Sequence, residues 1–254
     1  KNMRRGCKFG NIELNDSMLI DGLTDFFSNK HMGELTERLI QEENITKKEL
    51  DNYSKRSYEN ARNAYSNNFF SNELLPIEVK NKKTTMIINE DEEVNKIPDL
   101  NKLETLRAAF KNDGTITAGN ASKLSDGAAF MILASENYVN ENNINPIAEI
   151  VSYELTAGPP DEFAILPMKS IENLCFKQEI NTTDIDLFEV NEAFAISPII
   201  CCKELGINED KMNIYGGAIA LGHPIGCSGT RIISTLITGL KQRNRKCVDI
   251  QTEP

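Results

Sequence analysis

The residues best suited to chemistry lie in segment 215–231, YGGAIALGHPIGCSGTR. Five glycines surround His223, the only side chain there that titrates near neutral pH. Glycines let the backbone approach a ligand closely, and a helix is expected to begin just beyond Pro224. A histidine near the positive end of a helix is favoured in its neutral form, as a general base requires. A glycine-rich turn with a structural histidine would show the same pattern, whereas phosphate-loop and dinucleotide-binding spacings are missing.

Two further segments place polar or small residues where a ligand could bind. Asn191 and Glu192 follow the apolar run 185–190, at the carboxyl end of a predicted strand, where α/β proteins form their ligand crevice. The same pair would also suit a helix start, as cap and first-turn acid. The loop 111–127, KNDGTITAGNASKLSDG, has no core pattern. Its residues 117–122 suit either an extended ligand or a plain connection.

Local patterns predict the elements that position these segments, beginning with the first 120 residues. Residues 1–35 show no periodicity and are expected to be irregular. Thr46 and Glu49 form a capping box. A helix is expected to follow to about residue 65, with Leu50, Tyr53, Ser57 and Ala61 on one face. Alternation over 73–94 predicts a surface hairpin, and residues 100–110 are expected to be helical.

The second part of the chain alternates strands with helices, which predicts an α/β layered domain. The run AAFMILA at 128–134 has the composition of a strand buried on both faces, and Ser135 is expected to cap a short helix. Further strands are predicted at 147–153 and 185–190. Helices are predicted at 167–178, 193–205 and 228–241, the last with Ile232, Ile233, Leu236, Ile237 and Leu240 on one side.

Composition excludes several classes of function. The 254 residues carry 28 basic and 38 acidic side chains, a net charge of −10. A duplex nucleic-acid binder normally presents a basic face, so no nucleic-acid partner is expected. No apolar run approaches the ~20 residues of a membrane helix, and no membrane partner is expected. The six cysteines and two histidines lack zinc-site spacing, and free cysteines fit a reduced, intracellular setting.

Taken together, the three segments resemble the thiolase family. NEAF, GGAIALGHPIGCSGTR and GTITAGNASKLSDGAA stand in the order and relative spacing of thiolases. DGLTD at 21–25, KHMG at 30–33 and LETLRAAF at 103–110 agree, so the resemblance runs along essentially the whole chain. It implies an acyltransferase that condenses two acetyl-CoA molecules to acetoacetyl-CoA or runs the reverse thiolysis. The CoA thioester is then the substrate, and no separate cofactor is expected.

The resemblance also implies roles for individual residues. His223 would activate a nucleophilic cysteine and, with a water positioned by Asn191, form an oxyanion hole. Glu192, Gly222 and Gly226 would support the loops around them. The His-Met-Gly segment is similar to that of the short-chain, acetoacetyl-CoA subgroup. Contacts to the CoA thioester would come from His31, Met32, Phe110, Ala118, Gly119, Ser122, Ala193 and Phe194.

The sequence departs from the family pattern at both catalytic cysteines. Cys7 lacks the surroundings of the nucleophile, which in thiolases lies further ahead of the His-Met-Gly segment. Cys247 lacks the Cys-x-Gly-Gly-Gly setting of the second cysteine, and Cys227 is interpreted as a packing substitution. The chain alone is therefore expected to be inactive. A catalytically dead CoA-binding protein and a 3-ketoacyl-CoA thiolase of broader chain length are the alternatives. Val94 stands where a potassium-binding subgroup has tyrosine, so no metal is expected.

The fold implied by the resemblance is the α/β, thiolase-type layered αβαβα fold, present in part, with an α+β loop domain. Residues 1–123 would form the CoA-binding loop domain. Residues 124–145 would be the return strand and helix of the N-terminal half, and 146–254 most of the C-terminal half. The chain would then be roughly the last two-thirds of a larger enzyme. That enzyme would be a homodimer or homotetramer in the cytoplasm or mitochondria.

Overall fold

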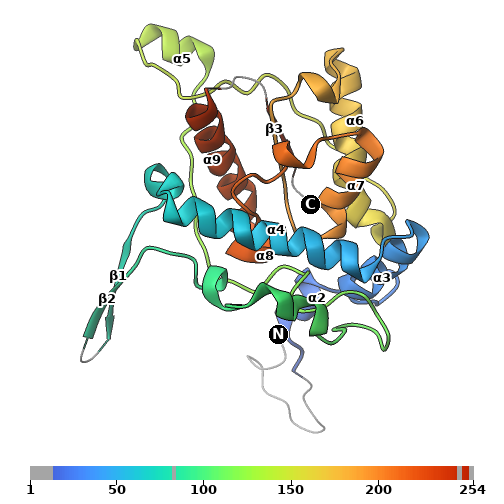
Figure 1. Cartoon of the computed structure of the whole chain (residues 1–254). Helices are drawn as coiled ribbons and strands as arrows, with labels where there is room; N and C mark the ends of the chain where they lie inside the picture. The colour runs from blue at the N-terminus through green and yellow to red at the C-terminus, as the bar shows by residue number, and fades with distance from the viewer. Residues whose placement is uncertain (1–13, 82–83, 245–247, 252–254) are drawn as a thin grey trace, which may run out of the picture.

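The 20-residue helix α4 (Lys47–Ser66) runs across the molecule and organises its packing (Figure 1). The computed structural model describes residues 14–81, 84–244 and 248–251. The predicted capping box is confirmed, because Thr46 accepts from the Glu49 amide and the Glu49 carboxylate accepts from the Thr46 amide. The predicted inner face is confirmed too, since its four residues are all buried: Leu50, Tyr53, Ser57 and Ala61.

The other elements of the described residues follow in chain order. The α-helices are α2 (Ser17–Gly22), α3 (Met32–Glu42), α5 (Glu136–Glu141), α6 (Leu166–Gln178), α7 (Ile196–Leu205), α8 (Ala218–Leu221) and α9 (Ile225–Arg243). The 3-10 helices are η1 (Phe69–Asn72), η2 (Glu92–Asn95), η3 (Leu100–Thr105), η4 (Pro160–Ile165), η5 (Thr182–Asp184) and η6 (Glu209–Lys211). The strands are β1 (Ile77–Asn81), β2 (Thr84–Ile88), β3 (Leu187–Val190) and β4 (Val248–Gln251).

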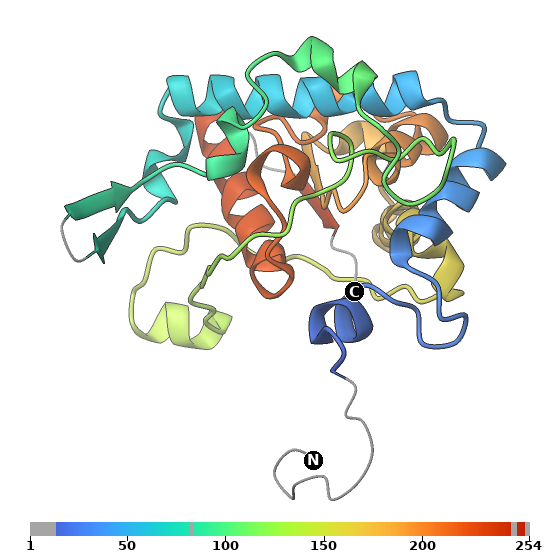
Figure 2. The same cartoon turned by 90° about the horizontal axis from the view of Figure 1, so that it is seen from below.

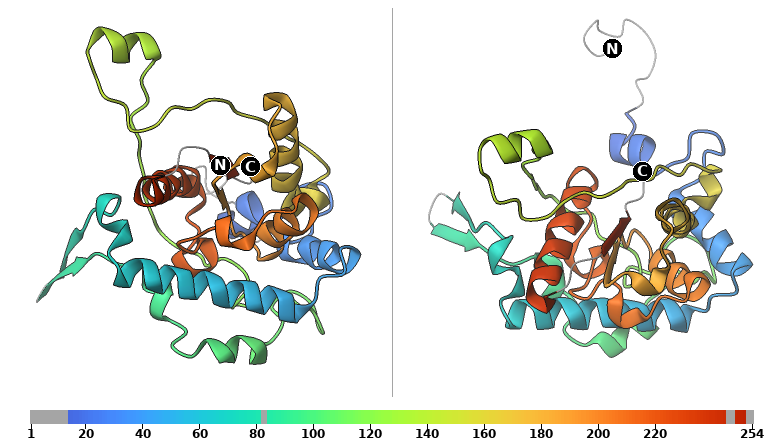
Figure 3. Two further views of the ribbon diagram at one scale, coloured as in Figure 1. Left: turned by 45° about the horizontal axis from the view of Figure 1, so that its top comes forward. Right: turned by 90° about the horizontal axis from the view of Figure 1, so that it is seen from above.

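A short parallel sheet forms the centre of the second part of the chain. β3 pairs with β4, with Leu187 opposite Val248 and Val190 opposite Gln251. Helix α9 packs on β3, and α6 packs on α7 and β4, so β3 lies between two helical layers (Figure 3). All four residues of β3 are buried. This is a local α–β–α arrangement, and it confirms the strand predicted at 185–190 and the helices predicted at 167–178 and 228–241.

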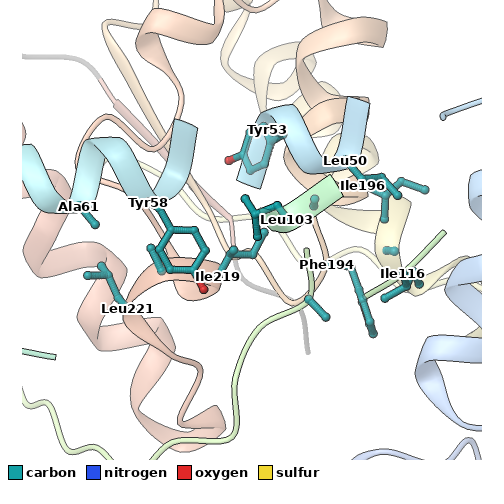
Figure 4. Packing of buried hydrophobic residues seen from close by; sticks show 14 of the residues in the cluster. Leu50, Tyr53, Tyr58, Ala61, Leu103, Ile116, Phe194, Ile196, Ile219 and Leu221 are labelled. Carbon is teal, nitrogen blue, oxygen red and sulfur yellow. The ribbon is translucent and has the colours of Figure 1, made fainter. Parts of the chain in front are cut away.

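The main hydrophobic core lies beneath α4 (Figure 4). Tyr58 and Ala61 of α4 are fully buried and face Ile219 and Leu221 of α8. A second cluster surrounds β3 and includes Phe188, Val190, Ile171 of α6 and Cys201 of α7. Apolar burial of this kind supplies most of the folding free energy, about 25 cal/mol per Å². β3 lies in the second cluster and residues 194–196 lie in the first, so the chain passes from one core to the other as it leaves the sheet.

Two predicted strands are absent from the structure. Residues 128–134 and 147–153 are extended but belong to no strand, and they carry α5 away from the body of the molecule (Figure 2). Phe130 and Ile132 are 85% and 88% exposed, and Val151 is 79% exposed. A strand requires hydrogen-bonding neighbours. The described strands pair only as β1 with β2 and β3 with β4, so these apolar runs have no sheet to join.

Three other boundaries differ from prediction. Residues 17–22 form helix α2 within the segment expected to be irregular, with Asp16 as its cap. The helix expected over 100–110 ends with η3 at Thr105, and Ala108 instead forms a β-bridge with Thr117. Helix α7 begins at Ile196 rather than 193, because the backbone of Ala193 and Ala195 bonds to the loop at 120–122.

Several predicted surface features are confirmed. β1 and β2 form an exposed antiparallel hairpin, and Ser135 caps α5 by accepting from the Tyr138 amide.

Cys7 and Cys247 lie outside the described residues. Among the helices that the structure describes, none has the length and apolarity needed to cross a bilayer.

The exposed apolar run makes a first prediction. The double substitution Phe130→Ser with Ile132→Ser should change the unfolding free energy of this chain by no more than ~0.5 kcal/mol, because neither side chain is packed. It should also reduce self-association, since exposed apolar segments with high β-propensity tend to aggregate. Urea unfolding and light scattering measure the two effects. A loss above ~2 kcal/mol would instead indicate the buried strand that the sequence suggests.

Candidate functional site

The three segments singled out in the sequence meet in space. The backbone amide of Ser122 donates to the carbonyl of Ala193 at 2.9 Å, and Ala195 donates back to Asn120 at 3.1 Å. The amide of His223 donates to the carbonyl of Lys123 at 3.1 Å. Residues 120–123 therefore form a bridge between the loop after β3 and the loop before α9. The site is built largely by backbone contacts between loops far apart in the chain.

Asn191 and His223 stand together at this junction. Asn191 is the first residue after β3, and His223 precedes α9 by two residues, so both loops are held by packed elements. Asn191 Nδ2 lies 3.4 Å from His223 Nε2. Asn191 is 2% exposed, and its Oδ1 has no hydrogen-bond partner among the described residues. An orphaned buried acceptor is costly, so this oxygen is suited to accept from a bound water or ligand.

The other nitrogen of His223 is oriented by Ser228, in the first turn of α9. His223 Nδ1 lies 2.7 Å from the Ser228 hydroxyl, which itself donates to the Pro224 carbonyl at 3.2 Å. The tautomer that satisfies both contacts has its proton on Nδ1, which leaves a lone pair on Nε2. Nε2 can then accept a proton and, once protonated, donate a hydrogen bond to a developing oxyanion.

Burial is the main reason that the pKa of His223 lies below its usual value, and the nearby Arg231 guanidinium lowers it further. The histidine is thus neutral at pH 7, as predicted, although desolvation rather than the helix N-terminus is the leading cause. His31 is similar, because burial lowers its pKa as well, against an opposing effect of Glu34.

Glu192 is fully buried and accepts four hydrogen bonds. Tyr53 and Ser57 of α4 donate hydroxyl groups at 2.8 Å each. Asn213 donates its side-chain amide at 2.9 Å, and the Ile219 backbone amide donates at 3.1 Å. Glu192 is not in the first turn of a helix, because α7 begins only at Ile196. The interpretation of Asn191 and Glu192 as a helix cap and first-turn acid is therefore wrong. Glu192 ties the loop after β3 to α4 and α8.

The glycines beside His223 have different surroundings. Gly222 has a φ of +97°, which L side chains rarely adopt, and a Cβ there would lie 2.3 Å from the Ser125 hydroxyl. Glycine is therefore required for the turn that presents His223. Gly226 has open space around it, with no atom within 4 Å of the point where a Cβ would lie. Its supporting role stays a prediction.

An aromatic row leads away from the junction. The His31 ring stacks on Phe110 with centroids 4.7 Å apart, and Phe110 contacts Phe194 edge-on at 6.2 Å. His31 also caps α3, since its Nδ1 accepts from the Gly33 amide at 3.0 Å. A Cβ on Gly33 would lie 2.4 Å from the Phe110 ring, so the close packing requires glycine there. The structure thus brings His31, Phe110 and Phe194 together.

The remaining predicted contact residues lie along the same loop or beside it. Met32 packs at the edge of the main core, and Gly119 is buried, whereas Ala118 is exposed. Ser122 is half-buried, and Ala193 packs against the core. Of His, Cys, Asp and Glu side chains, the described part of the chain holds no group of three or more arranged to bind a metal ion, and Val94 is buried.

Sequence reasoning missed the residues that hold the loop from beneath. Glu37 of α3, 1% exposed, accepts from the backbone amides of Thr115 and Ile116 at 2.8 and 2.7 Å. Asp51 of α4 accepts from Asn120 Nδ2 at 2.9 Å. One signal was available in the sequence: Asp51 directly follows the core residue Leu50. Acids are rarely buried without a partner, so a carboxylate next to a core position indicates a buried polar contact.

Comparison with known families gives two matches that together cover most of the chain. Residues 1–137 match the thiolase N-terminal domain, and residues 144–250 match the thiolase C-terminal domain. An acetyl-CoA acetyltransferase of Synechocystis is 41% identical over 232 residues, 91% of this chain and 59% of that protein. A probable acetyl-CoA acyltransferase of Staphylococcus aureus is 40% identical over 237 residues, 93% of this chain and 60% of its own length. A cytosolic acetyl-CoA acetyltransferase of Gibberella zeae is 38% identical over 247 residues, which are 96% of this chain and 62% of that protein.

Solved structures agree with these relatives. The acetyl-CoA acetyltransferase of Bacillus anthracis superposes with a TM-score of 0.92 at 34% identity, over 100% of this chain and 64% of that one. Human mitochondrial 3-ketoacyl-CoA thiolase superposes with a TM-score of 0.91 at 38% identity, over 98% of this chain and 63% of that one. A thiolase of Ascaris suum in complex with coenzyme A superposes with a TM-score of 0.86 at 35% identity, over 92% of this chain and 60% of that one. The chain thus spans about three-fifths of the length of these proteins, and it belongs to the thiolase family.

Proposed function

We propose that this chain forms the coenzyme A thioester site of a thiolase-type acyltransferase, which condenses two acetyl-CoA molecules or runs the reverse thiolysis. One observation carries the proposal. The Asn191–His223 pair, with an unpartnered buried oxygen, lies where the three family segments meet. A neutral imidazole beside an amide that can hold a water is suited to stabilise the oxygen of a thioester as charge develops on it.

The chemistry of the site follows from the proton positions. In this proposal His223 Nε2 takes the proton of a cysteine thiol, and the thiolate attacks the thioester carbonyl while the CoA thiolate leaves. Burial raises the pKa of Cys202 to about 12 and also raises that of Cys227, so neither is a ready nucleophile. We assign the nucleophile to the part of the relatives' length that this chain does not span, as the family resemblance implies.

The proposed substrates are acetyl-CoA, acetoacetyl-CoA and CoA. A short acyl group is proposed because the His-Met-Gly segment, whose His31 stacks on Phe110, is similar to that of the acetoacetyl-CoA subgroup. The contact residues proposed along the thioester are His31, Met32, Phe110, Ala118, Gly119, Ser122, Ala193 and Phe194. A 3-ketoacyl-CoA thiolase of broader chain length is the second candidate, supported by the similarity to the human mitochondrial enzyme of that name.

The architecture and setting of the whole protein form part of the same proposal. We infer a CoA-binding loop domain at 1–123, a return strand and helix at 124–145, and the C-terminal half of the αβαβα fold at 146–254. The exposed apolar runs at 128–134 and 147–153 support it, because they would enter sheets in a complete layered fold. The full-length protein would be a homodimer or homotetramer of the cytoplasm or mitochondria, where relatives are placed by name.

Binding without turnover is the main prediction for the chain itself. Isothermal titration calorimetry should show saturable binding of acetyl-CoA, and His223→Ala should weaken it about 3–10-fold through loss of one hydrogen-bonding group. Thiolysis of acetoacetyl-CoA, followed by absorbance, should stay at the level of the His223→Ala variant. Absence of binding would contradict the proposed site. Turnover above that control would contradict the proposed origin of the nucleophile, and so would acyl transfer to Cys227 detected by mass spectrometry.

The Ser228 contact makes a third prediction, which nuclear magnetic resonance of the two imidazole rings can test. His223 should be protonated on Nδ1 at pH 7 and should titrate below 6.5. Ser228→Ala removes the acceptor, so the ring should become a mixture of tautomers. The signals of His31 provide the internal control and should not change. An unchanged His223 tautomer in Ser228→Ala would show that another group orients the ring.

A further inference from the structure

Lys123 joins the loop at 117–122 to the histidine loop through both its backbone and its side chain. Its carbonyl accepts from the His223 amide at 3.1 Å. Its Nζ donates to the Ala121 carbonyl at 2.8 Å, which closes the backbone turn around Ser122. Ala121 in turn forms a β-bridge with Phe194. The conformation of this one residue therefore affects each of the three segments that build the site.

The side chain of Lys123 is half-buried, and its ammonium group lies against the core. Nζ is 6.0 Å from the ring centroid of Tyr58, a fully buried residue of α4 whose hydroxyl has no partner among the described residues. The carboxylates of Glu93 and Glu192 attract the ammonium, and Lys96, at the end of η2, repels it. Burial outweighs these charges and lowers the pKa of Lys123 to about 8.

A buried ammonium of this kind is a cost to the folded state. The unfolded chain holds this proton up to about pH 10.5 and the folded chain only up to about pH 8, so the cost is fully present below pH 8. Between these two values the unfolded chain binds more protons than the folded chain, so the folded state gains stability as the pH rises, and the cost is gone above about pH 10.5. Methionine has similar length and an apolar stem without the charge. A lysine at this position is therefore explained by what its charge does to the loop, and not by its contribution to stability.

We propose that Lys123 is a positioning residue, whose protonated side chain binds the Ala121 carbonyl and draws the loop at 117–122 against the Tyr58 ring, and so holds Ser122 and His223 in the geometry that binds a CoA thioester. This inference rests on the proposed function. It ties ligand binding to the charge of one side chain. Loss of the Lys123 proton should loosen the loop and weaken ligand binding, although it leaves the apolar packing of the fold in place.

The test compares the wild-type chain with Lys123→Met, Lys123→Arg and the surface control Lys80→Met. Lys80 lies on the exposed hairpin, far from the site in sequence. Acetyl-CoA is the probe, because its sulfur carries no titrating proton. Calorimetry at pH 7 and 9.5 should show roughly tenfold weaker binding by wild type at the higher pH, as expected for loss of a charged hydrogen bond. Lys80→Met should behave as wild type.

The variants separate positioning from a structural role. Lys123→Met should bind roughly tenfold more weakly at both pH values, yet unfold at the same or a higher temperature than wild type at pH 7. Lys123→Arg keeps its charge at pH 9.5 and should lose the pH dependence. Wild-type affinity that is constant between pH 7 and 9.5, or Lys123→Met affinity equal to wild type, would overturn the inference.

A ligand-free measurement distinguishes failure of this inference from failure of the proposed function. Hydrogen exchange should be faster at the His223 amide in Lys123→Met than in Lys80→Met, because that amide donates to the Lys123 carbonyl. If wild type binds no acetyl-CoA at pH 7, the proposed function fails, and the exchange result alone decides whether Lys123 holds the loops. Equal exchange in the two variants would overturn the inference.

Discussion

The structure depends on one buried carboxylate, that of Glu192. A carboxylate has about four acceptor positions, and the hydroxyls of Tyr53 and Ser57 with two N–H donors, from Asn213 and the Ile219 backbone, occupy all four. These donors come from α4, from the loop before α8 and from α8 itself. Burying a charge is tolerated only when it is this fully satisfied. The arrangement therefore fixes the loop after β3 in a single position, and Asn191 with it.

The same principle extends across the site. The loop at 115–122 places Ile116 and Ala121 in the main core, and buried acids beneath it fix its backbone: Glu37 binds its backbone amides, and Asp51 binds Asn120. Polar contacts of this kind are directional, so they select one loop conformation where apolar packing would allow several. The helices thus act as a frame, and carboxylates on their inner faces hold the loops that carry the chemistry. His223 completes the site through Ser228 on α9.

Sequence reasoning succeeded where the pattern was local. The Thr46–Glu49 capping box, the strand at β3 and helix α9 were all predicted, because each is specified by neighbouring residues. It failed at 128–134, whose apolar composition is that of a buried strand but whose pairing partners are not among the described residues. The positions of Glu37, Lys123 and Ser228 were also missed. Their roles come from contacts between segments far apart in the chain, which composition and spacing do not encode.

Substitution of Glu192 by glutamine tests the central claim most directly. Glutamine keeps the shape but turns one acceptor oxygen into a donor that faces two other donors. The free energy of unfolding should fall by about 2–5 kcal/mol, as unpaired buried polar groups cost. Chemical denaturation measures this loss. Acetyl-CoA affinity, measured by calorimetry under conditions where the variant is folded, should fall with it. A Glu192→Gln variant with wild-type stability and wild-type affinity would contradict the account.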